Sequence, residues 1–389
     1  MRGHIRAQSK NSWQITVDLG NGPDGNRRRY FETVKGAKKD AQRKLAQLLV
    51  NAEKGIVTTG GSSTLAALLQ EWLNGPVSRR CSERTAEVYR SIVDNHIIPS
   101  LGGVKLRNLE HAAIQRFYDG DAMRGLSPRS VRHVHGVLKA ALKYGLKQGY
   151  LGRNPCDLVD TPSTSKKEMR TLTADELETL LKAAEDNPSY PLIYTAVSSG
   201  LRQGELLALR WRDIDLPLVS ISVSRSLSKR HRVCTFKEPK TTKSRRKVRM
   251  TPKLALFLKG YRKQQEIAYL ELGRICGLDE LVFSNLPSGK PLDPYVVSHA
   301  FKKIARRAGF EDVRFHDLRH TFASLMFLHG ASPKVISEAL GHASVAFTMD
   351  TYSHIIDGMQ QDAMNLLNDV LPDGCLRNSV AELSRNLAI

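Results

Sequence analysis

The chain has 389 residues, which at about 150 residues per domain suggests two or three domains and excludes a single small module. Hydrophobic residues make up 41% and charged residues 25%, so a largely disordered chain is also excluded. The formal net charge is +20 and the pI about 9.8, which favours a polyanionic partner, either nucleic acid or an anionic membrane surface. The excess is spread as +7 over residues 1–58, +5 over 59–165 and +8 over the remainder. Because every part of the chain is basic, we favour nucleic acid.

The spacing of the cysteines and the hydropathy of the sequence indicate the cellular compartment of the protein. The five cysteines lie far apart and form no C-x-x-C pair, which argues against a disulfide framework and against a thiolate metal site. The N-terminus has no apolar signal region, and no stretch approaches the ~18 apolar residues that a membrane span requires. We therefore expect a soluble cytoplasmic protein.

Residues 1–58 predict a small ββ(β)α module. Alternating apolar residues indicate a strand over 13–19, a turn-rich stretch follows, and a second strand is predicted over 27–34. Apolar residues at helical spacing between 37 and 53 predict a helix that packs on this hairpin. A solvated basic hairpin without a ligand would look similar, but a β-ribbon that reads a DNA groove suits the basic residues beside Tyr30, which are Arg27, Arg28 and Arg29.

A Gly- and Ser-rich linker precedes a helical module that we place at 64–158. Apolar periodicity predicts helices over 64–75, 83–97, 110–120 and 127–148. The apolar residues of these helices form the core of the module, so only the polar faces remain as candidates for touching DNA. The residues concerned are Arg129, Arg132 and Lys139.

After a second linker at 161–167, the segment 168–389 reads as mainly helical with strands between 213 and 251. The predicted helices cover 174–185, 190–200, 203–210, 252–270, 294–308, 316–328, 333–340 and 359–369. The predicted fold class is therefore multidomain and mainly α, with an N-terminal ββ(β)α module, a four-helix domain, and a mainly helical third domain that contains a small sheet.

The densest cluster of reactive side chains lies in the sequence FHDLRHT. On a helix, His316, Arg319 and His320 stand at i, i+3 and i+4 and share one face. A zinc site is the alternative, but the metalloprotease motif requires Glu where this chain has Asp317, and Arg319 would place a fixed cation beside the metal. A cationic face of this kind suits a phosphate, because a guanidinium binds phosphate oxygens in bidentate fashion.

Two further clusters are weaker alone. In SGLRQGELLALRW, Arg202 and Glu205 lie one helical turn apart, although a surface ion pair would look the same. In LGHAS and DTYSHI, His342 precedes Tyr352 by ten residues. An isolated Tyr or His usually has a structural role, so these residues indicate a functional site only when they are taken together with the other clusters.

Together these motifs resemble the Arg, His-x-x-Arg, His and Tyr boxes of the tyrosine recombinase (phage integrase) family. The five box residues occur in order and without a departure in residue type, as Arg202, His316, Arg319, His342 and Tyr352. The resemblance implies an arm-type DNA-binding domain at 1–58, a core-binding domain at 64–158 and a catalytic domain at 168–389. It also implies a three-domain integrase of a prophage or an integrative conjugative element.

The resemblance further implies a mechanism. Tyr352 is expected to attack the scissile phosphate and form a 3′-phosphotyrosine, while Arg202, Arg319 and His342 stabilise the transition state. Glu205 orders the pocket and His316 assists proton transfer at the nucleophile. The general acid is a lysine on a β-hairpin, for which Lys240 matches best and Lys243 is the rival. Other basic residues of this turn, Lys243 and Arg245 among them, are expected to contact DNA phosphates.

No metal or cofactor is expected, because arginines, a lysine and histidines can take the electrostatic role of Mg²⁺. The expected DNA partners are double-stranded attachment sites with core and arm elements, on which the protein is expected to form a homotetramer. An accessory directionality factor and a host DNA-bending protein are the expected protein partners. The expected location is the cytoplasm of a bacterial host, at its nucleoid. A type IB topoisomerase and a non-catalytic DNA-binding regulator are the alternatives.

Overall fold

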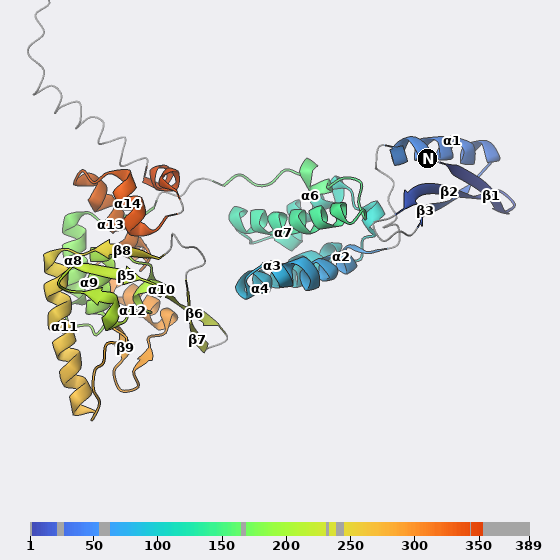
Figure 1. The fold of residues 1–389 in the computed structure, drawn as a ribbon. Helices are drawn as coiled ribbons and strands as arrows, with labels where there is room; N and C mark the ends of the chain where they lie inside the picture. The colour runs from blue at the N-terminus through green and yellow to red at the C-terminus, as the bar shows by residue number, and fades with distance from the viewer. Residues whose placement is uncertain are drawn as a thin grey trace, which may run out of the picture. The chain divides into compact units, whose positions relative to one another are not determined.

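The computed structural model describes residues 2–21, 27–53, 63–164, 169–230, 233–238, 245–342 and 344–352. The chain divides into two compact units, Met1–Lys166 and Lys167–Ile389. Helices dominate both units, and each unit also contains small antiparallel sheet structure (Figure 1), which confirms the predicted fold class. The finer division into three domains stays a prediction. Within the described ranges, no helix combines the length and apolar character needed to cross a bilayer.

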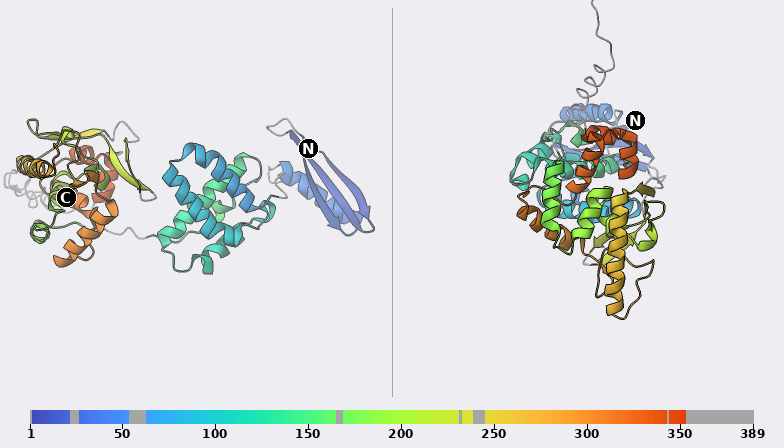
Figure 2. Two further views of the ribbon diagram at one scale, coloured as in Figure 1. Left: turned by 90° about the horizontal axis from the view of Figure 1, so that it is seen from below. Right: turned by 90° about the vertical axis from the view of Figure 1, so that its left-hand side faces the viewer.

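A three-stranded sheet with one helix opens the first unit (Figure 2). The antiparallel order is β1 (Gly3–Ser9), β2 (Ser12–Asn21) and β3 (Arg27–Lys35), and α1 (Lys38–Glu53) packs its apolar side on the buried Ile15 and Val17. The sequence pattern leaves the third strand of the ββ(β)α module open and does not locate β1, because this edge strand is exposed except for the half-buried Ile5.

The rest of the first unit is a helical bundle with one apolar core. Its helices are α2 (Leu65–Trp72), α3 (Ser78–Arg80), α4 (Glu83–Ile92), α5 (Ile98–Leu101), α6 (His111–Asp119) and α7 (Pro128–Lys147). Wider π-turns at Leu73–Val77 and Val93–Ile97 join α2 to α3 and α4 to α5. The first contains Pro76, which cannot donate a backbone hydrogen bond, so the helix continues through a widened turn. Helices thus occupy all four stretches where the periodicity predicts them.

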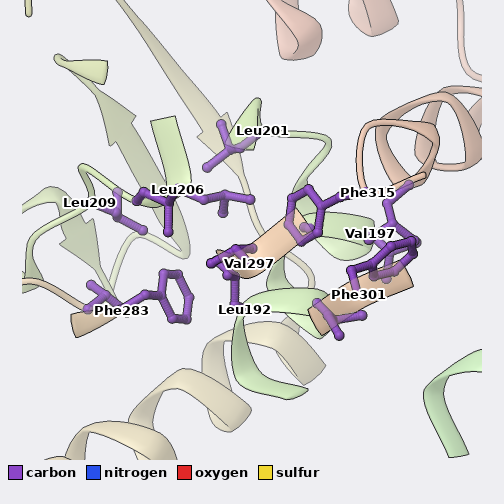
Figure 3. Packing of buried hydrophobic residues seen from close by; sticks show 14 of the residues in the cluster. Leu192, Val197, Leu201, Leu206, Leu209, Phe283, Val297, Phe301 and Phe315 are labelled. Atoms are coloured by element: carbon purple, nitrogen blue, oxygen red, sulfur yellow. The ribbon is translucent and has the colours of Figure 1, made fainter. Parts of the chain in front are cut away.

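The second unit wraps helices around a second core (Figure 3). Its helices are α8 (Ala174–Ala184), α9 (Tyr190–Ser199), α10 (Gln203–Leu206), α11 (Pro252–Glu271), α12 (Pro294–Arg307), α13 (Asp317–Leu328) and α14 (Pro333–Leu340). Its strands are β4 (Ile214–Asp215), β5 (Ser220–Val223), β6 (Ser226–Arg230), β7 (Val233–Lys237), β8 (Arg246–Arg249), β9 (Ser284–Asn285) and β10 (Lys290–Pro291), of which β4, β5 and β8 form one antiparallel sheet.

The predicted helix over 203–210 is wrong in its second half, because α10 ends at Leu206. Beyond it the backbone turns to pair with a distant segment: Arg210 forms a β-bridge with Leu281, and the Val282 amide donates to the Leu209 carbonyl. Tertiary pairing therefore overrides the local helical pattern. The predicted helix over 359–369 lies outside the described residues.

Candidate active site

Arg202 and Glu205 form the first half of the site at the start of α10. The Arg202 amide donates to Glu205 Oε2 over 2.9 Å, and its Nη1 donates to Glu205 Oε1 over 2.9 Å. Glu205 is buried and also accepts two hydrogen bonds from Arg246 of β8, at 3.1 and 2.9 Å. Burial alone would raise the pKa of Glu205, but Arg246 and then Arg202 outweigh it and hold that pKa below its ordinary value. The carboxylate therefore remains charged between two guanidinium groups.

Three consecutive carbonyl groups at the C-terminal end of α14 accept from three different arginines. Arg246 Nε donates to Ala339 O over 2.8 Å, Arg319 Nη2 to Leu340 O over 2.6 Å, and Arg202 Nη2 to Gly341 O over 3.0 Å. The C-terminus of a helix carries partial negative charge and leaves its carbonyls unpaired, which explains why three cations gather there. The end of α14 thus ties together side chains from α10, β8 and α13, which Figure 1 shows in the same part of the second unit.

Two glycines in left-handed conformation shape the backbone around these arginines. Gly200 (φ 64°) ends α9, and its carbonyl accepts from Arg319 Nη1 over 2.7 Å. Gly341 (φ 64°) ends α14 and carries the carbonyl that Arg202 contacts. Other residues adopt this conformation only with strain, so glycine is required at both turns.

Arg319 is buried at 4% exposure, and its pKa falls to about 9, chiefly through burial and then through the charge of Arg202. It is still a cation at neutral pH. The neighbouring guanidinium groups, only partly balanced by one carboxylate, make this pocket an anion site, and guanidinium donors suit phosphate oxygens.

The Tyr352 hydroxyl lies 2.9 Å from Nδ1 of His320, with which it forms a hydrogen bond. Tyr352 belongs to the helical segment 345–352; its side chain is fully buried, and its ring packs against Phe327 of α13. Burial raises the pKa of Tyr352 to about 12, an effect that the charge of Arg319 partly opposes. The hydroxyl is therefore protonated at neutral pH and needs a proton acceptor before it can attack.

Two other histidines near this pocket, His316 and His342, differ in their surroundings. His316 lies at the surface at the start of α13, with its ring centroid 5.1 Å from that of His320. The protein atoms around the ring partly desolvate it, and this desolvation, followed by the charge of Arg319, lowers the pKa of His316. His342 Nδ1 is hydrogen-bonded to the buried Thr348 Oγ1 at 2.8 Å, and burial together with the charges of Arg319 and Arg202 lowers its pKa to about 4. His342 is thus neutral at physiological pH and close to the arginines.

The two lysines that compete for the role of general acid, Lys240 and Lys243, lie outside the described residues, as does the side chain of Arg28. Several of the other predicted DNA contacts form ion pairs within the chain, where Arg27 meets Asp18, Lys139 meets Asp157 and Arg245 meets Glu238. Arg132 donates to the Thr164 hydroxyl, while Arg29 and Arg129 are exposed. Their role in binding DNA stays a prediction.

The chain matches two family descriptions, "Phage integrase family" over residues 170–358 and "Phage integrase, N-terminal SAM-like domain" over 64–120. It is 30% identical over 382 residues to a "Tyrosine recombinase XerC-like" protein of Caldanaerobacter subterraneus, covering 93% of this chain and 97% of the relative. The chain belongs to the phage integrase family. It is therefore a tyrosine-type site-specific recombinase, an enzyme of DNA strand cleavage and transfer.

Other comparisons agree with this family. The ICEBs1 integrase of Bacillus subtilis is 27% identical over 379 residues, covering 94% of this chain and all of the relative. The fold is similar to that of the Tn1549 transposon integrase in complex with a circular intermediate DNA, with a TM-score of 0.66 and 20% identity over 78% of this chain and 100% of the other. It is also similar to a lambda integrase dimer bound to a COC′ core site, with a TM-score of 0.57 and 19% identity over 89% and 93% of the two chains.

The sequence motifs supply five candidate residues, but they do not indicate two contacts that the structure shows. Arg246 lies in a run of basic residues, a pattern that predicts solvent exposure, yet its side chain is only 7% exposed. The period of two along β8 offers a signal, since Arg246 shares a face with the buried Val248. The contact between His320 and Tyr352 has no such local signal, because 32 residues separate them.

Proposed function

We propose that this recombinase integrates and excises a mobile DNA element by cleaving and rejoining its attachment sites through a covalent bond to Tyr352. The observation that carries the proposal is the convergence of four of the family's box residues in one unit. Arg202 and Arg319 both donate to the last turn of α14, His342 follows that turn directly, and the charge of Arg319 acts on the Tyr352 hydroxyl.

In the cleavage step, the Tyr352 oxygen attacks the scissile phosphorus and the bond to the 5′ oxygen breaks, which leaves a 3′-phosphotyrosine and a free 5′-hydroxyl. Arg202 and Arg319 would stabilise the charge on the non-bridging oxygens, because their guanidinium groups are already oriented by carbonyl and carboxylate acceptors and need little reorganisation. His342 would add a further hydrogen bond, and Glu205 holds Arg202 in place. Attack of a 5′-hydroxyl from another duplex then reseals the strand without an external energy source.

The leaving 5′ oxygen must gain a proton, and we assign this role to Lys240, with Lys243 as the competing candidate. A 5′-phosphorothiolate substrate separates them, since its sulfur leaves without help from an acid. Lys240→Ala and Lys243→Ala are compared on normal and sulfur-containing DNA. The sulfur substrate should restore cleavage only in the variant that lacks the true acid, and equal behaviour of both variants would contradict the assignment.

The expected partners follow from the relatives. The structures of the Tn1549 and lambda integrases contain bound DNA, and we propose that this chain binds core and arm sites on double-stranded DNA. We further propose that it forms a homotetramer during strand exchange and works with an accessory directionality factor and a host DNA-bending protein. Its proposed place of action is the nucleoid in the bacterial cytoplasm. Relaxation of supercoils alone is not favoured, because the relatives named above are integrases and recombinases along most of the chain.

The test is trapping of a covalent adduct on a nicked duplex that carries the direct repeat flanking the element. We expect a denaturation-resistant protein–DNA adduct, its loss in Tyr352→Phe, and unchanged DNA binding by that variant. An adduct that persists in Tyr352→Phe would refute the assignment of the nucleophile. EDTA should leave the reaction unaffected, and inhibition by EDTA would overturn the expectation of metal-free cleavage.

A further inference from the structure

The nucleophilic hydroxyl proposed above has a buried imidazole as its hydrogen-bond partner. Tyr352 is fully buried and His320 is 9% exposed, and 2.9 Å separates the hydroxyl from Nδ1. The distance and the tilted packing of the two rings, with centroids 5.9 Å apart, fit a hydrogen bond from the hydroxyl to an unprotonated Nδ1. No family box in the sequence includes His320, and the residue expected to assist the nucleophile is His316.

His316 lies one turn earlier on the same face of α13, at its exposed start. Its ring contacts that of His320 edge to face, whereas the hydrogen bond to the hydroxyl belongs to His320. The order from the interior to the surface is therefore Tyr352, His320 and His316. A proton acceptor must lie within hydrogen-bond reach of the proton it takes, and His320 meets this condition.

We infer that His320 is the proton acceptor for the Tyr352 hydroxyl during strand cleavage, an inference that rests on the proposed function. As the Tyr352 oxygen bonds to phosphorus, its proton passes to Nδ1 of His320. The bond from phosphorus to the 5′ oxygen breaks with its electron pair on oxygen, which gains a proton from the general acid. In resealing, the 5′-hydroxyl attacks, the tyrosine oxygen leaves, and His320 returns the proton to it.

The surroundings of His320 keep it unprotonated, and so able to accept a proton, before the cleavage step. Burial, followed by the charge of His316, lowers the pKa of His320 to about 4, so its imidazole is neutral and able to accept at physiological pH. A scissile phosphate held by Arg319, the residue before His320, would bring a negative charge that stabilises the imidazolium formed when His320 takes the Tyr352 proton. The titratable and charged groups that act on His320 are His316, Asp317, Arg319 and Arg314, together with Tyr352 from the segment 345–352 and His342 after α14.

The decisive variant is His320→Asn, because the Asn side-chain oxygen can occupy the place of Nδ1 and accept the hydrogen bond, but it cannot take the proton. Single-turnover adduct formation on the nicked duplex should fall by about 10²-fold to 10⁴-fold, with unchanged DNA binding. The remaining rate should rise with pH, since ionisation of the hydroxyl then depends on solvent. A ring-fluorinated tyrosine at position 352, whose hydroxyl is more acidic, should restore part of the lost rate. His329→Asn, at the exposed end of the same helix, is the matched control and should behave like the unaltered protein.

Full activity of His320→Asn would overturn the inference, and so would a loss that neither pH nor the fluorinated tyrosine relieves, since that pattern indicates a positioning role. A second measurement needs no variant: ¹⁵N NMR of histidine-labelled protein should show an unprotonated Nδ1 at His320, and a proton on that nitrogen would also overturn it. Failure of the proposed function is distinguishable, because it would appear as an adduct that survives Tyr352→Phe.

Discussion

Arg246 supports the site without belonging to any of the family boxes, and its removal should be costly. Its side chain is 7% exposed and that of Glu205 8%, and it donates twice to this carboxylate and once to Ala339 O. Arg246→Ala leaves the buried carboxylate with Arg202 as its remaining ion-pair partner and frees a carbonyl at the end of α14. Breaking a buried pair in this way costs about 3–5 kcal/mol of unfolding free energy. For a unit of this size the melting temperature should fall by roughly 10 °C.

The assay is urea unfolding followed by Trp211 fluorescence in a Trp13→Phe, Trp72→Phe background, since Trp211 is then the single tryptophan and lies in the core of the second unit. Arg249→Ala is the control on the same strand, because the Arg249 side chain is exposed and donates to Leu218 O. We expect it to cost at most about 1 kcal/mol. Equal losses for the variants at 246 and 249 would refute the assignment of Arg246 as a buried anchor.

Two further predictions concern the backbone and the pH dependence of the same unit. Gly200→Ala combines a positive φ with a methyl group that overlaps the Phe322 ring, so it should lower the free energy of unfolding by more than about 2 kcal/mol. Gly260→Ala, in an open position on α11, should raise it by about 0.5–1 kcal/mol. Similar urea midpoints for the two variants would contradict this. Because the pKa values of His320 and His342 fall to about 4 from an ordinary 6.5, the unfolded chain binds their protons first as pH drops. The contribution of these histidines to the free energy of unfolding should therefore be fully present above pH 6.5 and should be lost between pH 6.5 and 4, by up to about 3 kcal/mol for the buried His320. A urea midpoint that does not move over this pH range would contradict the burial of these groups.

Much of the architecture can be predicted from the sequence because its signals are local. Ser127 before Pro128, Thr251 before Pro252 and Ser332 before Pro333 cap α7, α11 and α14, with each hydroxyl accepting from a backbone amide of the first turn. Thr173 and Glu176 form a capping box at the start of α8. These pairs, together with apolar periodicity, place the helices to within a few residues. The same reasoning fails at 203–210, where a strand-like pairing with Leu281 ends the helix early.

The sequence by itself determined which side chains are candidates for the chemistry: guanidinium groups at 202 and 319, imidazoles at 316 and 342, and a phenol at 352, each in a motif that resembles a family box. Only the tertiary structure decided which atoms meet. It brought Arg202, Arg246 and Arg319 to successive carbonyls of one helix end, and it placed His320 against the tyrosine hydroxyl. The physical reason is that hydrogen bonds and burial depend on separation in space, and these partners lie between 21 and 139 residues apart along the chain.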